Sequence, residues 1–154
     1  MSLLLLLLDD AFFSAIAAIG FALVFNVPAR LLFLCAAGGA IGHSFRTLLM
    51  YFDGSIVWSS FFAAALVGVI GVYWSRKYLV PRPVFTVASV IPMIPGTYAF
   101  KAMISLLSMQ QVGYTEVLMA NLFENGVTMV FILLALSFGL ALPSVVIYRF
   151  RPIV

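Results

Sequence analysis

Long apolar windows alternate along the chain with short segments that contain charge, proline or glycine. A helix needs roughly 20 predominantly apolar residues to cross the hydrocarbon core of a bilayer, which is about 30 Å thick. Such windows recur over the whole sequence and leave no soluble domain over. We therefore predict one all-α transmembrane domain over residues 1–154 with about five helices, at about 11–25, 31–49, 57–75, 84–109 and 115–148.

The first window is preceded by the leucine-rich start "MSLLLLLLDD". It looks like the apolar part of a signal peptide, but it has no basic residues before its apolar run and no small-residue cleavage pattern, and Asp9 and Asp10 interrupt it. We expect this segment to be retained, as an outward extension of the first span.

The composition excludes several protein classes. Of the 154 residues, 65% are hydrophobic and 8% are charged, which is far from the balance of a soluble domain. One cysteine, Cys35, allows no intramolecular disulfide, and one histidine, His43, gives no basis for a metal site. We expect no metal and no cofactor. The basic residues lie in short loops rather than in a nucleic-acid patch, and no nucleophile, base and oxyanion site converge as an enzyme requires.

The basic residues also predict an orientation, because cytoplasmic loops are enriched in Lys and Arg. One side of the predicted membrane domain has at most Arg46, with Asp53 nearby. We therefore expect the N-terminus outside and the C-terminus in the cytoplasm. The opposite loops and the C-terminal end hold Arg30, Arg76, Lys77, Arg82, Arg149 and Arg151.

The fourth window is broken near its centre by Pro92, Pro95 and Gly96. Proline removes a backbone donor and clashes with the preceding turn, and irregular backbone persists at membrane depth only where protein or a wet cavity satisfies it. We expect Pro95 to lie in the first turn of a new half-helix, whose free amides at Gly96 and Thr97 would attract a carboxylate. The alternative is a purely structural kink.

Five segments of the sequence resemble the small subunit of the threonine/serine exporter family. They are "GFALVFNVP" (20–28), "GGAIGH" (38–43), "YWSRKYL" (73–79), "FTVASVIPMIPGTYAFKAM" (85–103) and "YRFRP" (148–152). The resemblance extends over nearly the whole chain, and its most specific motif is Pro92, Pro95 and Gly96.

This resemblance implies an export system of the bacterial inner membrane. Two-chain members of the family pair this half with a larger membrane subunit and are associated with succinate-like dicarboxylates, whereas single-chain members export threonine and serine. We expect a small subunit of a two-component secondary exporter of small carboxylates, with a dicarboxylate favoured and threonine or serine as the alternative. A structural subunit without substrate contacts is the third hypothesis, and a second copy of the chain is another candidate partner.

Lys101 and Glu124 are ionisable residues inside predicted spans, where such residues are functional candidates by default. They lie almost equally far from the short loop between the fourth and fifth spans, so antiparallel packing predicts similar depth and an ion pair. This pair would either neutralise two costly charges or act in transport, with Lys101 binding the substrate carboxylate and Glu124 exchanging a proton.

Other polar residues recur at helical spacing. In the fifth span a stripe of Asn121, Glu124, Asn125 and Thr128 either lines a pathway or bonds helices together.

Near the outer end of the second span, Arg46 either attracts a departing anion or extends to the interface, and His43 is either a packing residue or a proton relay. The small residues Gly38, Gly42, Ala64, Gly68 and Gly71 predict close helix contacts.

Overall fold

The computed structural model describes residues 3–150, and this part of the chain contains helices and no strand. The elements are α1 (Leu3–Val24), η1 (Ala29–Leu31), α2 (Leu32–Tyr51), α3 (Ile56–Tyr78), α4 (Pro83–Val90), η2 (Ile91–Met93), α5 (Gly96–Val112) and α6 (Glu116–Phe150).

Among the described residues, four helices are long and apolar enough to cross a membrane, or five if α4 with η2 and α5 together make one interrupted span. The predicted all-α class with about five spans is therefore confirmed. The chain divides into two compact units, residues 1–93 with 135–154 and residues 94–134, which are described separately below.

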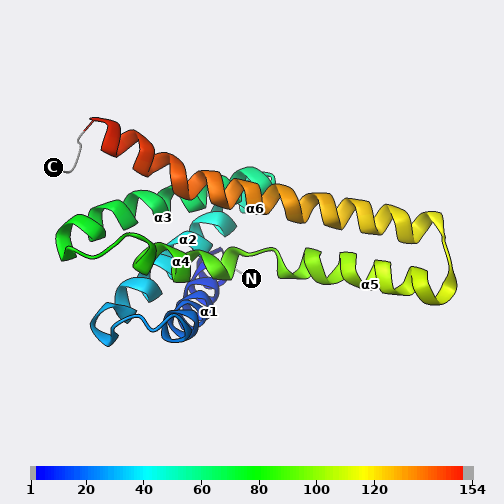
Figure 1. The fold of residues 1–154 in the computed structure, drawn as a ribbon, viewed down its shortest axis with the longest axis horizontal. Helices are drawn as coiled ribbons and strands as arrows, with labels where there is room; N and C mark the ends of the chain where they lie inside the picture. The colour runs from blue at the N-terminus through cyan, green and yellow to red at the C-terminus, as the bar shows by residue number, and fades with distance from the viewer. Residues whose placement is uncertain (1–2, 151–154) are drawn as a thin grey trace. The chain divides into compact units, whose positions relative to one another are not determined.

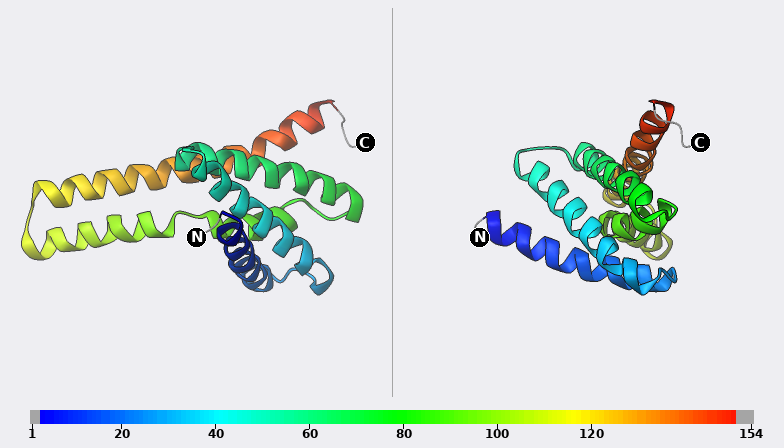
Figure 2. Two further views of the ribbon diagram at one scale, coloured as in Figure 1. Left: turned by 180° about the vertical axis from the view of Figure 1, so that it is seen from behind. Right: turned by 90° about the vertical axis from the view of Figure 1, so that its left-hand side faces the viewer.

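In the first unit, α2 packs against α1, α3 and α4 (Figures 1 and 2). The contact with α1 is built on small residues four positions apart, because Ser14, Ala18 and Ala22 are the buried residues of α1. A Cβ atom added to Gly39 of α2 would lie 2.7 Å from the Cβ atom of Ala18. Such a close approach gains dispersion contacts and needs no hydrophobic driving force, which lipid does not supply.

The small-residue faces predicted from the sequence are helix contacts. A Cβ atom at Gly42 would lie 2.7 Å from the side chain of Val67 on α3, and one at Gly68 would lie 3.1 Å from the backbone oxygen of Leu140 on α6. Both glycines are buried. Replacing either one would push two helices apart.

Helix α1 begins at Leu3, so the leucine run belongs to the helix as expected. Asp9 and Asp10 consequently lie inside it rather than at its edge. Asp9 is exposed and Asp10 is half-buried. Only Asp10 continues the four-residue spacing of the packed face.

The second unit consists of α5 and the part of α6 up to Leu134. The two helices run side by side in opposite directions (Figure 1). Gly113 ends α5 with φ 86°, a left-handed value that favours glycine, and its amide donates to the carbonyl of Met109.

Candidate functional site

The expected break between the two half-helices is present, and its backbone differs in detail from the prediction. Helix α4 continues into the short 3-10 turn η2, and α5 begins at Gly96. Pro95 is the N-cap residue of α5 and does not lie in its first turn, where the sequence predicts it. Pro95 has φ −77° and ψ 58°, and the Gly96 amide donates to the Ile94 carbonyl at 2.8 Å. These values describe an inverse γ-turn.

The prediction of a free amide at Gly96 is therefore wrong, because this amide donates to the Ile94 carbonyl within the turn. The amides of Thr97 and Tyr98 have no backbone acceptor in the described part of the chain, as expected for a first helical turn. Gly96 also does not make the bend. Its φ is not positive and a Cβ atom there would meet nothing within 4 Å, so the turn resides in Pro95.

In the first unit, Arg46 binds the end of the helix that precedes the break. Its Nη1 donates to the carbonyl oxygen of Met93 at 2.8 Å. Met93 closes η2, and a carbonyl at a helix C-terminus carries partial negative charge that a cation stabilises. Arg46 is half-buried. This contact adds a structural role to the two considered from the sequence, the attraction of an anion and the extension to the interface, which stay predictions.

A polar chain continues from Arg46 to α1. Arg46 Nη2 lies 3.0 Å from His43 Nε2, and His43 Nδ1 lies 3.6 Å from Asp10 Oδ2. Thr47 donates its hydroxyl to the same Asp10 oxygen. Ser44 extends the contact between the helices by donating to the carbonyl of Leu7 at 3.2 Å.

Asp10 and Thr47 were not among the site residues predicted from the sequence. The signal that identifies Asp10 is its spacing, because it lies four residues before Ser14 on the face that continues through Ala18 and Ala22. Thr47 follows His43 by four residues on α2. A helical projection that included Asp10 in the first span would have placed it on the packed face of α1.

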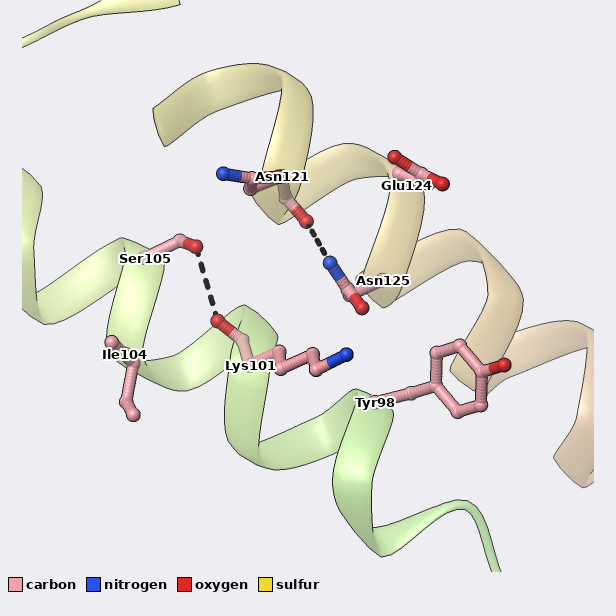
Figure 3. A pocket seen from close by; sticks show the side chains of 7 residues that line it. All are labelled: Tyr98, Lys101, Ile104, Ser105, Asn121, Glu124 and Asn125. Atoms are coloured by element: carbon pink, nitrogen blue, oxygen red, sulfur yellow. Dashed lines mark hydrogen bonds between the residues drawn. The ribbon is translucent and has the colours of Figure 1, made fainter. Parts of the chain in front are cut away.

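The second unit contains a cavity of about 580 Å³ between α5 and α6 (Figure 3). Its lining is mostly polar, although the helices around it are apolar. Tyr98, Lys101 and Ser105 are spaced by three and four along α5, and Asn121 and Asn125 by four along α6, so each set shares a face of its helix. The lining residues are Tyr98, Lys101, Ile104 and Ser105 from α5, and Asn121, Glu124 and Asn125 from α6.

The predicted ion pair between Lys101 and Glu124 is not formed. No salt bridge within 4.0 Å joins Lys101 and Glu124 in the described part of the chain, although both line the same cavity. Figure 3 shows the Lys101 ammonium extending toward α6 and the Glu124 carboxylate directed away from it. The physical reason is that Asn121 and Asn125, four residues apart, occupy the side of α6 that faces α5, while Glu124 lies about 100° round the helix from Asn125.

Two polar side chains of the cavity are held by their own helices. Asn125 Nδ2 donates to the carbonyl of Asn121 at 2.7 Å, and Ser105 donates its hydroxyl to the carbonyl of Lys101 at 3.0 Å (Figure 3). These bonds fix the two side chains and leave the Lys101 ammonium as a charged donor in the cavity. Thr128, the fourth residue of the predicted polar stripe, does not line it.

The structure thus separates the predicted site residues into two groups. His43, Arg46 and Pro92 belong to the first unit, and the remaining seven belong to the second. Among the described residues, no group of three or more His, Cys, Asp or Glu side chains lies close enough to hold a metal ion.

Comparison with known families gives a clear match. The sequence model of the family described as "Threonine/Serine exporter, ThrE" matches residues 10–146. These residues include the helix break, the polar chain around Arg46 and the whole cavity of the second unit. No solved structure matches the fold.

Proposed function

The chain belongs to the threonine/serine exporter family, and from this premise we propose that it is the small membrane subunit of a two-component exporter of small carboxylate metabolites. A succinate-like dicarboxylate is the first candidate substrate. The family consists of membrane transporters, and the four to five spanning helices agree with a multi-pass membrane protein. The bacterial inner membrane is the proposed location.

The observation that carries the substrate class is the Lys101 ammonium in the cavity of the second unit. A volume of about 580 Å³ lies within the range of small-molecule sites, which is about 300–1,000 Å³. Hydroxyl and amide groups of Tyr98, Asn121 and Asn125 surround it and can donate to carboxylate oxygens. A charge-assisted bond from an ammonium to a carboxylate is stronger than a bond between neutral groups.

The exposure of this cavity in the single chain supports a partner protein that covers it. Lys101 and Glu124 are both exposed in the single chain, between large apolar side chains such as Phe100 and Phe123 that suit lipid contact. Charged groups at membrane depth face protein or a water-filled cavity rather than acyl chains. We propose that the larger membrane subunit supplies the missing wall, with a second copy of this chain as the alternative.

Glu124 favours threonine or serine as the second candidate substrate. With its side chain turned toward Lys101, Glu124 would give the cavity one carboxylate beside one ammonium, which matches a zwitterion whose carboxylate binds Lys101 and whose ammonium group binds Glu124. A dicarboxylate would instead place its second negative charge near that of Glu124, unless a proton neutralises one of them. The negative charge of Glu124 would therefore favour a zwitterion and disfavour a dicarboxylate.

Export from cells that express this chain with its larger subunit tests the proposal. We expect release of the substrate to fall by about tenfold or more in Lys101→Met, because a hydrogen bond to a charged group is lost. Lys77→Met is the matched control, since Lys77 is the other lysine of the chain and lies at the end of α3. Equal export by Lys101→Met and the native protein would refute a substrate-binding role for the cavity.

The same cells distinguish the substrates. Glu124→Gln should reduce release of threonine and serine if the substrate is a zwitterion, and should leave or increase release of succinate if it is a dicarboxylate. Release of all three compounds is measured in parallel from each strain, together with the amount of both subunits in the membrane.

A further inference from the structure

His43 lies between a carboxylate and a guanidinium inside the first unit. Its Nε2 atom is 3.0 Å from Arg46 Nη2, and its Nδ1 atom is 3.6 Å from Asp10 Oδ2. The Nδ1 atom is buried and makes no hydrogen bond, because 3.6 Å is too long for one. The proposed substrate cavity contains none of these three residues.

The contact with Arg46 determines which ring nitrogen carries the proton. A guanidinium has five N–H donors and no acceptor, so the bond at 3.0 Å requires a lone pair on Nε2. The neutral ring must then carry its hydrogen on Nδ1, which faces the Asp10 carboxylate. The arrangement thus defines the tautomer with its hydrogen on Nδ1, and it leaves Nε2 as the ring nitrogen that can bind a second proton.

We propose that His43 Nε2 is a proton-binding site, and that a proton bound there releases Arg46 from the carbonyl of Met93. The incoming proton occupies the lone pair that now accepts from Arg46, so the two occupants exclude each other. The protonated imidazole and the guanidinium then repel at contact distance. Binding of the proton therefore breaks the hydrogen bond between Arg46 and His43, and it makes the contact between His43 and Asp10 an ion pair.

The charged groups that contact His43 in the described part of the chain are Asp10 and Arg46. From α1, Asp10 faces the ring, and the same oxygen of its carboxylate accepts a hydrogen bond from the neutral hydroxyl of Thr47. From α2, Arg46 is the charged neighbour, and η2 contributes the Met93 carbonyl to that same guanidinium. In the described part of the chain, no salt bridge or hydrogen bond joins His43 to α3 or α4.

The consequence reaches the helix break because Arg46 stabilises its first half. The Met93 carbonyl ends η2, where no following helical amide replaces the guanidinium, since Pro95 begins the new turn. Met93 is itself fully buried, and its methyl carbon would lie 3.3 Å from a Cβ atom at Gly42. Release of Arg46 leaves a buried carbonyl without its charged donor and favours opening of this segment.

The first test uses the purified full chain without any substrate, so its failure is separate from failure of the proposed export function. His43 is the only histidine of the sequence. Protein purified with a histidine-free tag and labelled with ¹⁵N-histidine therefore gives one imidazole in the NMR spectrum. We expect the neutral ring to carry its hydrogen on Nδ1, with Nε2 unprotonated, and both nitrogens to be protonated at low pH.

The second test measures opening at Met93. Maleimide labelling of Met93→Cys is followed between about pH 4.5 and 8 in a Cys35→Ala background, because His has an ordinary pKa of about 6.5. The same cysteine in a His43→Gln protein corrects for the pH dependence of the thiol. We expect the ratio of the two labelling rates to rise by about tenfold over the range in which NMR shows protonation of His43, the factor expected for loss of one charged hydrogen bond.

Two further variants complete the test. Asp10→Asn should remove much of the pH response, because the protonated ring loses its ion pair, whereas Asp9→Asn on the exposed neighbouring carboxylate should retain it. A neutral ring with its hydrogen on Nε2 would refute the proposal, and so would a labelling ratio that stays constant while His43 titrates.

Discussion

At the scale of single residues, the interfaces of the first unit depend on glycines that leave no room for a methyl group. A Cβ atom at Gly38 of α2 would overlap the hydroxyl of Ser89 on α4 and would lie 3.0 Å from the Cβ atom of Ser89. That serine is buried, and its single hydroxyl hydrogen is shared between the carbonyls of Phe85 at 2.7 Å and Cys35 at 3.1 Å. Any movement of the side chain away from Gly38 would disturb these hydrogen bonds.

We expect Gly38→Ala to destabilise the protein by about 1–3 kcal/mol, because the added methyl group overpacks a filled interface. Gly20→Ala is the control, since a Cβ atom at Gly20 meets nothing within 4 Å. In a helix this second change should be neutral or stabilising by about 0.5–1 kcal/mol. Thermal unfolding of both variants in one detergent measures the difference, and equal unfolding temperatures would contradict the close contact.

At the scale of secondary structure, the same residue type has different effects in two helices. Pro143 lies inside α6, which continues from Glu116 to Phe150. One proline there removes one backbone donor, and the nearby Leu140 carbonyl also receives Arg82 Nη1 at 3.4 Å. Pro92 and Pro95 instead remove two donors within a single turn, and the helix is interrupted there.

The combined change Pro92→Ala, Pro95→Ala and Gly96→Ala should therefore restore a continuous helix. We expect the proposed complex with a larger subunit to assemble and its export to be lost, because the first-turn amides of α5 become part of the helical ladder. Pro143→Ala serves as the control and should retain export. Co-purification measures assembly and metabolite release measures transport. Normal export by the triple variant would favour a structural subunit without substrate contacts.

At the scale of the whole molecule, the orientation in the membrane is a prediction from charge alone. Arg30 lies in η1, which follows α1, and Arg82 lies in the loop that follows α3. Arg76 and Lys77 lie in the last turn of α3. Positive charge of this kind is retained in the cytoplasm. The predicted Arg151 lies outside the described residues.

A C-terminal fusion to alkaline phosphatase should consequently show low activity, because that enzyme is active only outside the cytoplasm. The same fusion placed after Asp53, in the loop between α2 and α3, should show high activity. Expression of both fusions is compared on blots. The reverse pattern would invert the orientation.

The residues themselves show which parts of the site were predictable. Pro92 and Pro95 break a helix through their own covalent structure, so the break was visible in the sequence. The i, i+4 spacing of Asn121 and Asn125 likewise placed both on the face that lines the cavity. The direction of Glu124 was not predictable, because equal distance from a loop gives depth along a helix but not rotation around it.

The sequence by itself determined the helical membrane class, the number of spans and the interruption, since apolar length and proline act locally along one segment. The tertiary structure alone decided that Arg46 binds Met93 and that His43 joins it to Asp10. Met93 lies 47 positions from Arg46, and Asp10 lies 33 positions from His43. Their contact depends on how α1, α2 and η2 pack, which no local pattern encodes.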